Sequence, residues 1–227
     1  MMSNAAELKA LYPFLHGIAQ DPAQLDAALL RSVAEKARHS RETNARFFAD
    51  QAPVLVDAAK SIAGVYRRGG RLFSMGNGGS SCDASHVAVE FVHPITAGRP
   101  ALAAINLVAD LAMISAVGND VGFEHVFARQ IVAQGRAGDG LVGISTSGNS
   151  ENLMAAFTKA KEMGIITVGL AGGDGGRMRS AVDHCLVVPT DSIHRIQESH
   201  VTAYHILWDL VHTLLADDRG SAVQGAA

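Results

Sequence analysis

Five short apolar runs alternate with helical stretches between Arg71 and Pro189, and this alternation leaves the chain few possible folds. The runs read RLFSM, LAAINL, LVGIST, ITVGLAG and HCLVVP. Strands that alternate with helices are typical of a parallel sheet covered by helices on both faces. We therefore predict an α/β fold with a five-stranded parallel sheet that is doubly wound. Its ligands should bind at the carboxyl ends of the strands.

The strand order that best suits this pattern is flavodoxin-like. A helical segment precedes the first predicted strand. Apolar residues recur at helical spacing over residues 24–51, and Pro53 fits the first turn of a second helix that Gly69 stops. We expect residues 1–69 to be helices that pack on the core or on a neighbouring subunit. Residues 70–216 should form the α/β domain, with a final helix over 192–216, and residues 217–227 a flexible tail.

Composition excludes several classes of function. The net charge is −3, so the chain lacks the basic surface of a nucleic-acid-binding protein. The apolar runs are strand-sized and too short to cross a bilayer, and the first residues show no secretory signal pattern. Only Cys82 and Cys185 occur, too few for a disulfide framework. We expect a cytoplasmic protein that binds neither nucleic acid nor membrane.

Two turns between a strand and a helix have the composition of an anion site. They are GNGGSS, which includes Asn77, Gly78 and Ser80, and STSGNS, residues 145–150. Glycine permits close backbone approach, hydroxyls donate hydrogen bonds, and the helix that follows offers free N–H groups. Neither loop carries a lysine or a nucleotide-binding motif, which favours a single phosphate monoester. The alternative is that each loop is simply a turn and a helix cap.

Polar residues on two predicted helices are candidates for chemistry. His86 and Glu90 are four apart, so a helix places them on one face. On the final helix, Gln197 and His205 are eight apart, about two turns. The alternative is that His86 and Glu90 form an ordinary surface contact. Gln197 would then be a helix-start residue, and His205 a hydrogen-bonded core residue. Spacing alone does not choose between these readings.

The combined motifs resemble the sugar isomerase (SIS) domain, and within it the phosphoheptose isomerases. The matching segments are GNGGSSCDASH, the Glu90 that follows, RP, VGND, GISTSGNS and RIQESH with His205 beyond it. The resemblance implies a homotetramer with active sites between subunits. It also implies that the phosphate is held by Ser80, Ser145, Thr146, Ser147 and Ser150.

The resemblance further implies the conversion of sedoheptulose 7-phosphate to D-glycero-D-manno-heptose 7-phosphate through an enediol, a step of heptose biosynthesis. Glu90 and His205 would be the acid/base pair, with Asp120 nearby. A carboxylate suits proton removal from carbon, and an imidazole suits proton exchange with oxygen near neutral pH. Relatives that bind Zn²⁺ use the positions of His86, Glu90, Gln197 and His205. A carboxylate held by zinc is a weaker base, so these two roles compete.

Some positions depart from the family pattern and leave rival functions open. His194 stands where relatives carry Asp, and FVHPITAG, which contains His93, replaces a TGR-like stretch. The two histidines are either new substrate contacts or ordinary surface residues, and we favour the second interpretation. One rival is an isomerase for another ketose phosphate. The other is a non-enzymatic adaptor, since the DnaA-initiator-associating protein resembles this chain in both serine loops. That relative lacks the carboxylate and the final histidine, which this chain retains.

Overall fold

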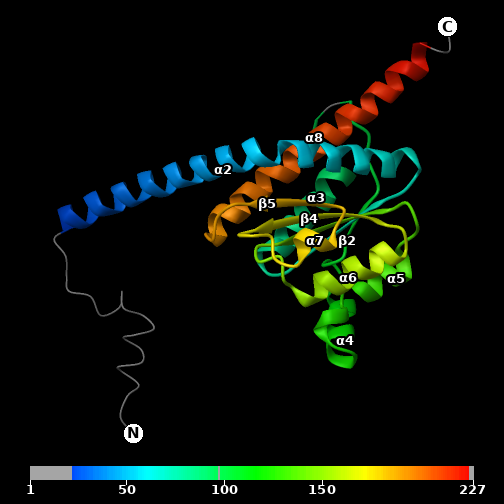
Figure 1. Ribbon diagram of the computed structural model, residues 1–227, viewed down its shortest axis with the longest axis horizontal. Helices are drawn as coiled ribbons and strands as arrows, with labels where there is room; N and C mark the ends of the chain where they lie inside the picture. Colours follow the sequence, from blue (N-terminus) through cyan, green and yellow to red (C-terminus); the bar gives the residue numbers. More distant parts are fainter. Residues whose placement is uncertain (1–21, 97, 225–227) are drawn as a thin grey trace. The chain divides into compact units, whose positions relative to one another are not determined.

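The computed structural model describes residues 22–96 and 98–224, and its centre is one parallel sheet (Figure 1). The order β2-β1-β3-β4-β5 is the flavodoxin-like order, and all four neighbouring strand pairs are parallel. The predicted fold class is confirmed. The strands are β1 (Leu72–Gly76), β2 (Ala104–Asn106), β3 (Gly140–Ser145), β4 (Ile166–Gly172) and β5 (His184–Val188).

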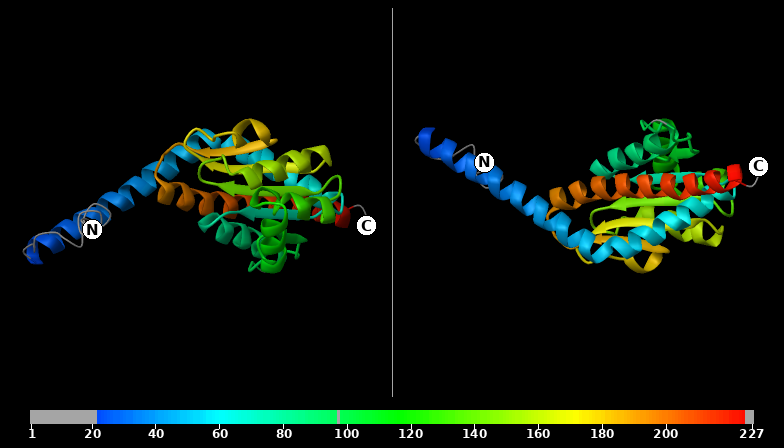
Figure 2. Two further views of the ribbon diagram at one scale, coloured as in Figure 1. Left: turned by 90° about the horizontal axis from the view of Figure 1, so that it is seen from below. Right: turned by 90° about the horizontal axis from the view of Figure 1, so that it is seen from above.

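Helices cover both faces of the sheet (Figures 1 and 2). Successive strand residues point to opposite faces: Leu72 packs with one hydrophobic cluster and Phe73 with the other. The first cluster takes residues from α2, α3 and α8, and the second from α4 through α7. The helices are α2 (Pro22–Arg67), α3 (Gly79–Val92), α4 (Leu111–Asp120), η2 (Phe123–His125), α5 (Ala128–Gln134), α6 (Glu151–Glu162), α7 (Met178–Ala181) and α8 (Ile193–Gln224).

The N-terminal helical segment differs from the two-helix prediction. Residues 22–67 form one helix, and Pro53 lies inside it. Phe47 and Leu55, on either side of Pro53, are both buried in the first cluster, and this packing holds the helix together across the missing hydrogen bond. The compact unit that carries the sheet begins at Ser40 and so includes most of α2. The preceding residues that the structure describes, 22–39, are helical.

The C-terminal helix α8 also runs further than its sequence pattern indicates. It continues to Gln224, through residues 217–224 of the expected tail. The last three residues lie outside the described part of the chain. Among the described residues, no helix has both the length and the apolar character needed to cross a bilayer.

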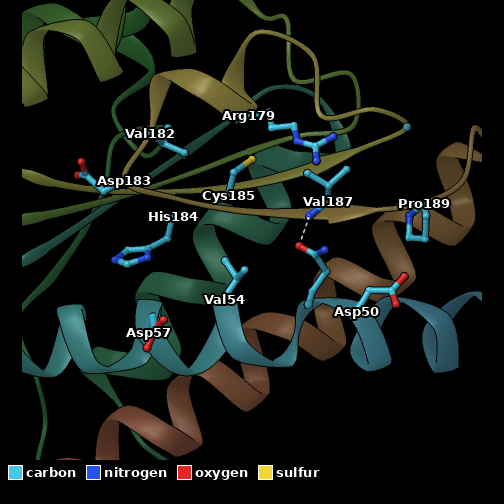
Figure 3. Close-up of a pocket in the computed structure, with 12 residues that line it drawn as sticks. Asp50, Val54, Asp57, Arg179, Val182, Asp183, His184, Cys185, Val187 and Pro189 are labelled. Atoms are coloured by element: carbon cyan, nitrogen blue, oxygen red, sulfur yellow. Dashed lines mark hydrogen bonds between the residues drawn. The ribbon is translucent and has the colours of Figure 1, made fainter.

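Helix α2 contacts the strand at the outer edge of the sheet, β5. The side-chain oxygen of Gln51 accepts a hydrogen bond from the backbone N–H of Val187 on β5, at 3.3 Å (Figure 3). Ser61 and His184 are joined at 2.8 Å further along the same edge. An open groove of about 500 Å³ lies between α2 and β5, and Asp50 is one of its lining residues. Because edge strands pair readily with other chains, these contacts protect β5.

His200 on α8 makes folding sensitive to pH. Its side chain is fully buried and its Nε2 lies 3.1 Å from the carbonyl oxygen of Ala171. Burial lowers the pKa of His200 to about 4, well under the ordinary value near 6.5. Above pH 6.5 both the folded and the unfolded chain carry the neutral imidazole. Below it the unfolded chain takes up the proton first, so the free energy of unfolding should fall by about 1.4 kcal/mol per pH unit until about pH 4.

Urea unfolding at pH 7.5 and pH 5 measures this effect. His200→Gln keeps an N–H donor for Ala171 and does not titrate. The wild-type protein should therefore lose about 2 kcal/mol more than this variant between the two pH values. Equal losses in both proteins would contradict the assignment.

Candidate active site

Two helices from distant parts of the chain lie side by side and carry the candidate residues. Gln197, near the start of α8, lies against Gly79, the first residue of α3, where an added methyl group would be 2.4 Å from the amide nitrogen of Gln197. Eleven residues further along each helix, the indole nitrogen of Trp208 is 2.8 Å from the carbonyl oxygen of Glu90. The contacts advance in the same direction along both helices. Helices α3 and α8 are therefore parallel neighbours.

This packing gathers His86, Glu90 and His205. The Nε2 atom of His86 is 3.1 Å from the Oε1 atom of Glu90 and 3.4 Å from the Nε2 atom of His205. All three side chains are half-buried, and their potential ligand atoms lie within 4.8 Å of one another. A carboxylate and two imidazoles thus face one small volume that solvent can reach.

A buried tyrosine fixes the orientation of His86. The hydroxyl of Tyr204 lies 2.8 Å from Nδ1 of His86, on the ring side opposite Glu90. Burial, together with the charges of Asp83 and Glu90, raises the pKa of the Tyr204 phenol above its ordinary value. The phenol therefore keeps its proton at neutral pH. Its hydrogen bond holds the Nε2 atom of His86 toward the other two side chains.

The same surroundings affect His205. Burial lowers the pKa of His205 below its ordinary value, the charge of His86 lowers it further, and Glu90 opposes both effects. Neutral imidazole is the form that accepts a proton or binds a metal ion. The site thus favours the form of His205 that either role requires.

The three gathered side chains fit a zinc ion. Zinc holds nitrogen and oxygen ligands at about 2.0–2.1 Å in a tetrahedron, which separates the ligand atoms by about 3.4 Å. The two distances from His86, 3.1 Å to Glu90 and 3.4 Å to His205, are close to this, and the three ligand atoms all lie within 4.8 Å of one another. The hydroxyl of Tyr204 is a suitable outer partner for a metal-bound His86. Gln197 lies instead beside Gly79, seven residues or about 10 Å along α3 from His86.

The STSGNS loop brings three serine hydroxyls together at the carboxyl end of β3. The Oγ atom of Ser145 lies 3.1 Å from that of Ser150 and 3.4 Å from that of Ser147. The backbone N–H of Gly148 donates to Ser145 at 3.2 Å. Helix α6 begins at Glu151, so its free N–H groups follow this cluster directly. Hydroxyls and amides at a helix start form a suitable phosphate cradle.

The two serine loops are tied to each other. The side-chain amides of Asn77 and Asn152 exchange hydrogen bonds of 2.8 and 2.9 Å. An open cavity of about 570 Å³ lies between the loops, lined by Asn77, Ser150, Asn152, Phe123, Glu124 and Glu151. Ser80 is buried at the start of α3. Both loops thus border one accessible volume at the carboxyl ends of β1 and β3.

The glycine-rich segment 172–178 supports the second loop. The N–H of Met178 donates to the carbonyl oxygen of Gly148 at 2.9 Å. Gly148 has φ of +65°, and a methyl group there would lie 2.1 Å from the carbonyl oxygen of Gly175. Only glycine fits this position.

The remaining candidates lie apart from this cluster or carry no contact to it. Asp120 is exposed at the end of α4, and its carboxylate accepts a hydrogen bond from Asn119 at 2.8 Å. Thr146 lines a second cavity of about 470 Å³, which Ser147 of the serine cluster also borders. His93 and His194 are exposed, as surface residues would be.

Sequence reasoning missed three residues that support the site: Tyr204, Trp208 and Asn152. Trp208 had a usable signal, since it follows His205 by three positions and so shares its helix face. Tyr204 had none, because adjacent helix positions point in different directions. The partner of Asn152 depends on how two loops meet in space.

Comparison with known proteins finds one matching family and several close relatives. The SIS domain family matches residues 37–172. A phosphoheptose isomerase from a Roseiflexus species is 42% identical over 188 residues, which is 83% of this chain and 95% of the relative. Another, from Desulfovibrio desulfuricans, is 44% identical over 195 residues, which is 86% of this chain and 92% of the relative.

Solved structures agree with the sequence relatives. A phosphoheptose isomerase from Neisseria gonorrhoeae has a TM-score of 0.77 at 37% identity, covering 82% of this chain and 99% of its own. One from Francisella tularensis has a TM-score of 0.78 at 34% identity, covering 81% and 98% respectively.

Proposed function

Because the chain belongs to the SIS domain family, and within it to the phosphoheptose isomerases, we propose that it interconverts sedoheptulose 7-phosphate and D-glycero-D-manno-heptose 7-phosphate. The observation that carries the proposal is the packing of α3 against α8. It places Glu90 and His205 around His86, while the start of α3 lies at the serine loops. Helix α3 can therefore contact both ends of one open-chain sugar: its first residues lie at the phosphate end, and Glu90 lies at the carbonyl end.

The phosphate is held at the loops in this proposal. The hydroxyls of Ser80, Ser145, Thr146, Ser147 and Ser150 donate to its oxygens, and Asn77 and Gly78 complete the first loop. His86 is six residues after Ser80, about 9 Å along the axis of α3. An extended sugar phosphate bridges this separation. Gln197 lies beside Gly79, at the phosphate end of this separation, and contacts the sugar chain there.

Glu90 and His205 carry out the proton transfers. The Glu90 carboxylate removes a proton from carbon 1 of the ketose and returns one to carbon 2 of the enediol. Neutral His205 accepts a proton from the oxygen on carbon 1 and passes it to the oxygen on carbon 2. Each group ends the cycle in its starting protonation state. Asp120 is proposed as a further substrate contact on the resemblance alone.

The His86, Glu90 and His205 set is proposed to hold Zn²⁺. When bound, zinc polarises the carbonyl and stabilises negative charge on the enediolate oxygens. Gln197 is the proposed fourth ligand by resemblance, but its place beside Gly79 favours substrate contact. We also propose a cytoplasmic homotetramer. Val89 on α3 and Ile206 on α8 are exposed close to the site, where a neighbouring subunit would cover them.

Turnover with a panel of ketose phosphates tests the function. The purified protein is incubated with sedoheptulose 7-phosphate and with hexulose and pentulose phosphates, each with added zinc and with a chelator. The aldose product should form fastest from sedoheptulose 7-phosphate. Faster turnover of another ketose phosphate would reassign the substrate, and no turnover of any would favour an adaptor.

Gly79→Ala tests the position of Gln197. The added methyl group displaces a flexible amide and not backbone, so the fold should be retained. Loss of one hydrogen bond to the substrate should raise KM about tenfold with kcat nearly unchanged. Steady-state kinetics measure both. Gly64→Ala, also inside a helix and beside a flexible arginine, is the matched control and should leave KM unchanged. A wild-type KM in Gly79→Ala would exclude the substrate contact.

A further inference from the structure

The backbone of Glu90 has an unusual need for a hydrogen-bond donor. A carbonyl oxygen in a helix normally accepts from the N–H four residues later, and four residues after Glu90 stands Pro94, which has no N–H. Helix α3 ends at Val92, and the N–H of His93 already serves Val89. The carbonyl of Glu90 therefore depends on a donor from elsewhere in the fold.

Trp208 supplies that donor. Its indole N–H donates to the Glu90 carbonyl oxygen at 2.8 Å. Trp208 lies on α8 three residues after His205, nearly one helical turn, so both side chains emerge from the same face. One hydrogen bond thus joins the last turn of α3, which carries Glu90, to the turn of α8 that carries His205.

The indole ring is itself held in place. Trp208 is only 8% exposed. The guanidinium carbon of Arg99 lies 4.4 Å from the ring centroid, a cation–π distance, and Arg99 pairs with Asp209, the next residue of α8. The ring of His212 packs against its edge at 5.0 Å. Because these contacts hold the indole ring in place, its N–H strongly restricts the position of the Glu90 carbonyl oxygen.

We propose that Trp208 is a positioning residue that sets the distance between Glu90 and His205 by holding the Glu90 carbonyl. The proposal rests on the function proposed above. Without the indole N–H, the last turn of α3 loses its remaining backbone partner at Glu90 and can shift. A shift of about 1 Å in a reacting group can cost a hundredfold in rate, and loss of an outer contact can weaken a metal site tenfold or more. The serine loops lie at the other end of α3 and should be unaffected.

Trp208→Phe is the first test variant, because it keeps an aromatic ring for Arg99 and removes the N–H. A second protein replaces Trp208 with β-(3-benzothienyl)alanine, in which sulfur takes the place of the N–H at nearly the same volume. The control is Phe127→Leu, a buried change in the second hydrophobic cluster, away from α3 and α8. Thermal unfolding of all variants shows how far each is destabilised.

Three readouts separate positioning from general destabilisation. The first is kcat and KM with sedoheptulose 7-phosphate. The second is zinc affinity, from competition with a chromophoric chelator. The third is hydrogen exchange of the indole N–H in the wild-type protein, where Trp208 is the only tryptophan and gives one indole signal.

The indole proton should exchange at least about a hundredfold more slowly than in an unfolded peptide. Both Trp208 variants should lose about tenfold or more in kcat and in zinc affinity, with KM within about twofold of wild type. Phe127→Leu should retain both. An unprotected indole proton would overturn the proposal. So would wild-type kcat and zinc affinity in the benzothienyl variant, or equal losses in Phe127→Leu. If the wild-type protein proves inactive, the isomerase function fails, and the exchange and zinc measurements still decide this proposal.

Discussion

Glu90→Gln should reduce kcat for the conversion of sedoheptulose 7-phosphate by about a thousandfold and leave the fold intact. The amide has nearly the shape of the carboxylate but cannot accept a proton from carbon, and general base catalysis contributes about 10²–10⁴ in rate. The Glu90 side chain is one-fifth exposed, and its contact with His86 spans a single helical turn. Its loss should therefore change the free energy of unfolding by about 1 kcal/mol or less. Initial rates of aldose formation and urea unfolding measure the two effects.

Glu162→Gln is the matched control for this change. Glu162 ends α6, is exposed and pairs only with Lys159 among the contacts described for it. Its substitution should leave kcat and KM as in wild type. Appreciable turnover by Glu90→Gln in the presence of zinc would remove Glu90 from the role of base.

His205→Ala is expected to have an effect of similar size. The variant loses the proton carrier for the two substrate oxygens, which costs about 10²–10⁴ in rate, and one of the three candidate metal ligands. His205 is half-buried, and its ring contacts only the edges of His86 and Tyr204 among the ring contacts described for it, so the fold should survive its removal. Rates with zinc in excess separate the lost ligand from the lost proton carrier. If excess zinc restores wild-type kcat, His205 is a ligand only.

His194→Ala is the control for the histidine substitution. His194 is exposed on the first turn of α8, about eleven residues before His205. This variant should have wild-type kcat. A loss as large as that of His205→Ala would show that the site is placed wrongly along α8.

The fold was predictable because every strand is an apolar run between turn residues. β3 and β4 are buried on both faces, so their sequences are almost continuously apolar, as parallel central strands require. The long helix α2 was not predictable at Pro53. A proline predicts a helix boundary, and only the burial of Phe47 and Leu55 against the sheet outweighs it.

Half of the candidate site follows from spacing and half does not. His86 and Glu90 share a face because they are four apart on one helix, which the sequence contains. Their meeting with His205 depends on the register between α3 and α8, which tertiary packing decides. The same register places Gln197 beside Gly79, two helical turns from His205. The resemblance gave Gln197 as a zinc ligand together with the other three residues. Spacing alone could not show that Gln197 lies apart from them.

The supporting contacts were the least predictable part. Tyr204 orients His86 and Trp208 holds the Glu90 backbone, and both act across the boundary between two helices. Aromatic residues among leucines and valines are usually core residues, and both are indeed buried. Their polar atoms acquire a role only when the neighbouring helix is known.

Isomerisation of sedoheptulose 7-phosphate in deuterated water, followed by NMR with zinc present, tests the central claim most directly. Glu90 takes a proton from carbon 1 and exchanges it with solvent through its exposed edge. The wild-type protein should therefore yield D-glycero-D-manno-heptose 7-phosphate with deuterium at carbon 2, and Glu90→Gln should yield almost none. Absence of aldose above the protein-free rate, or aldose formed by Glu90→Gln at the wild-type rate, would contradict the account.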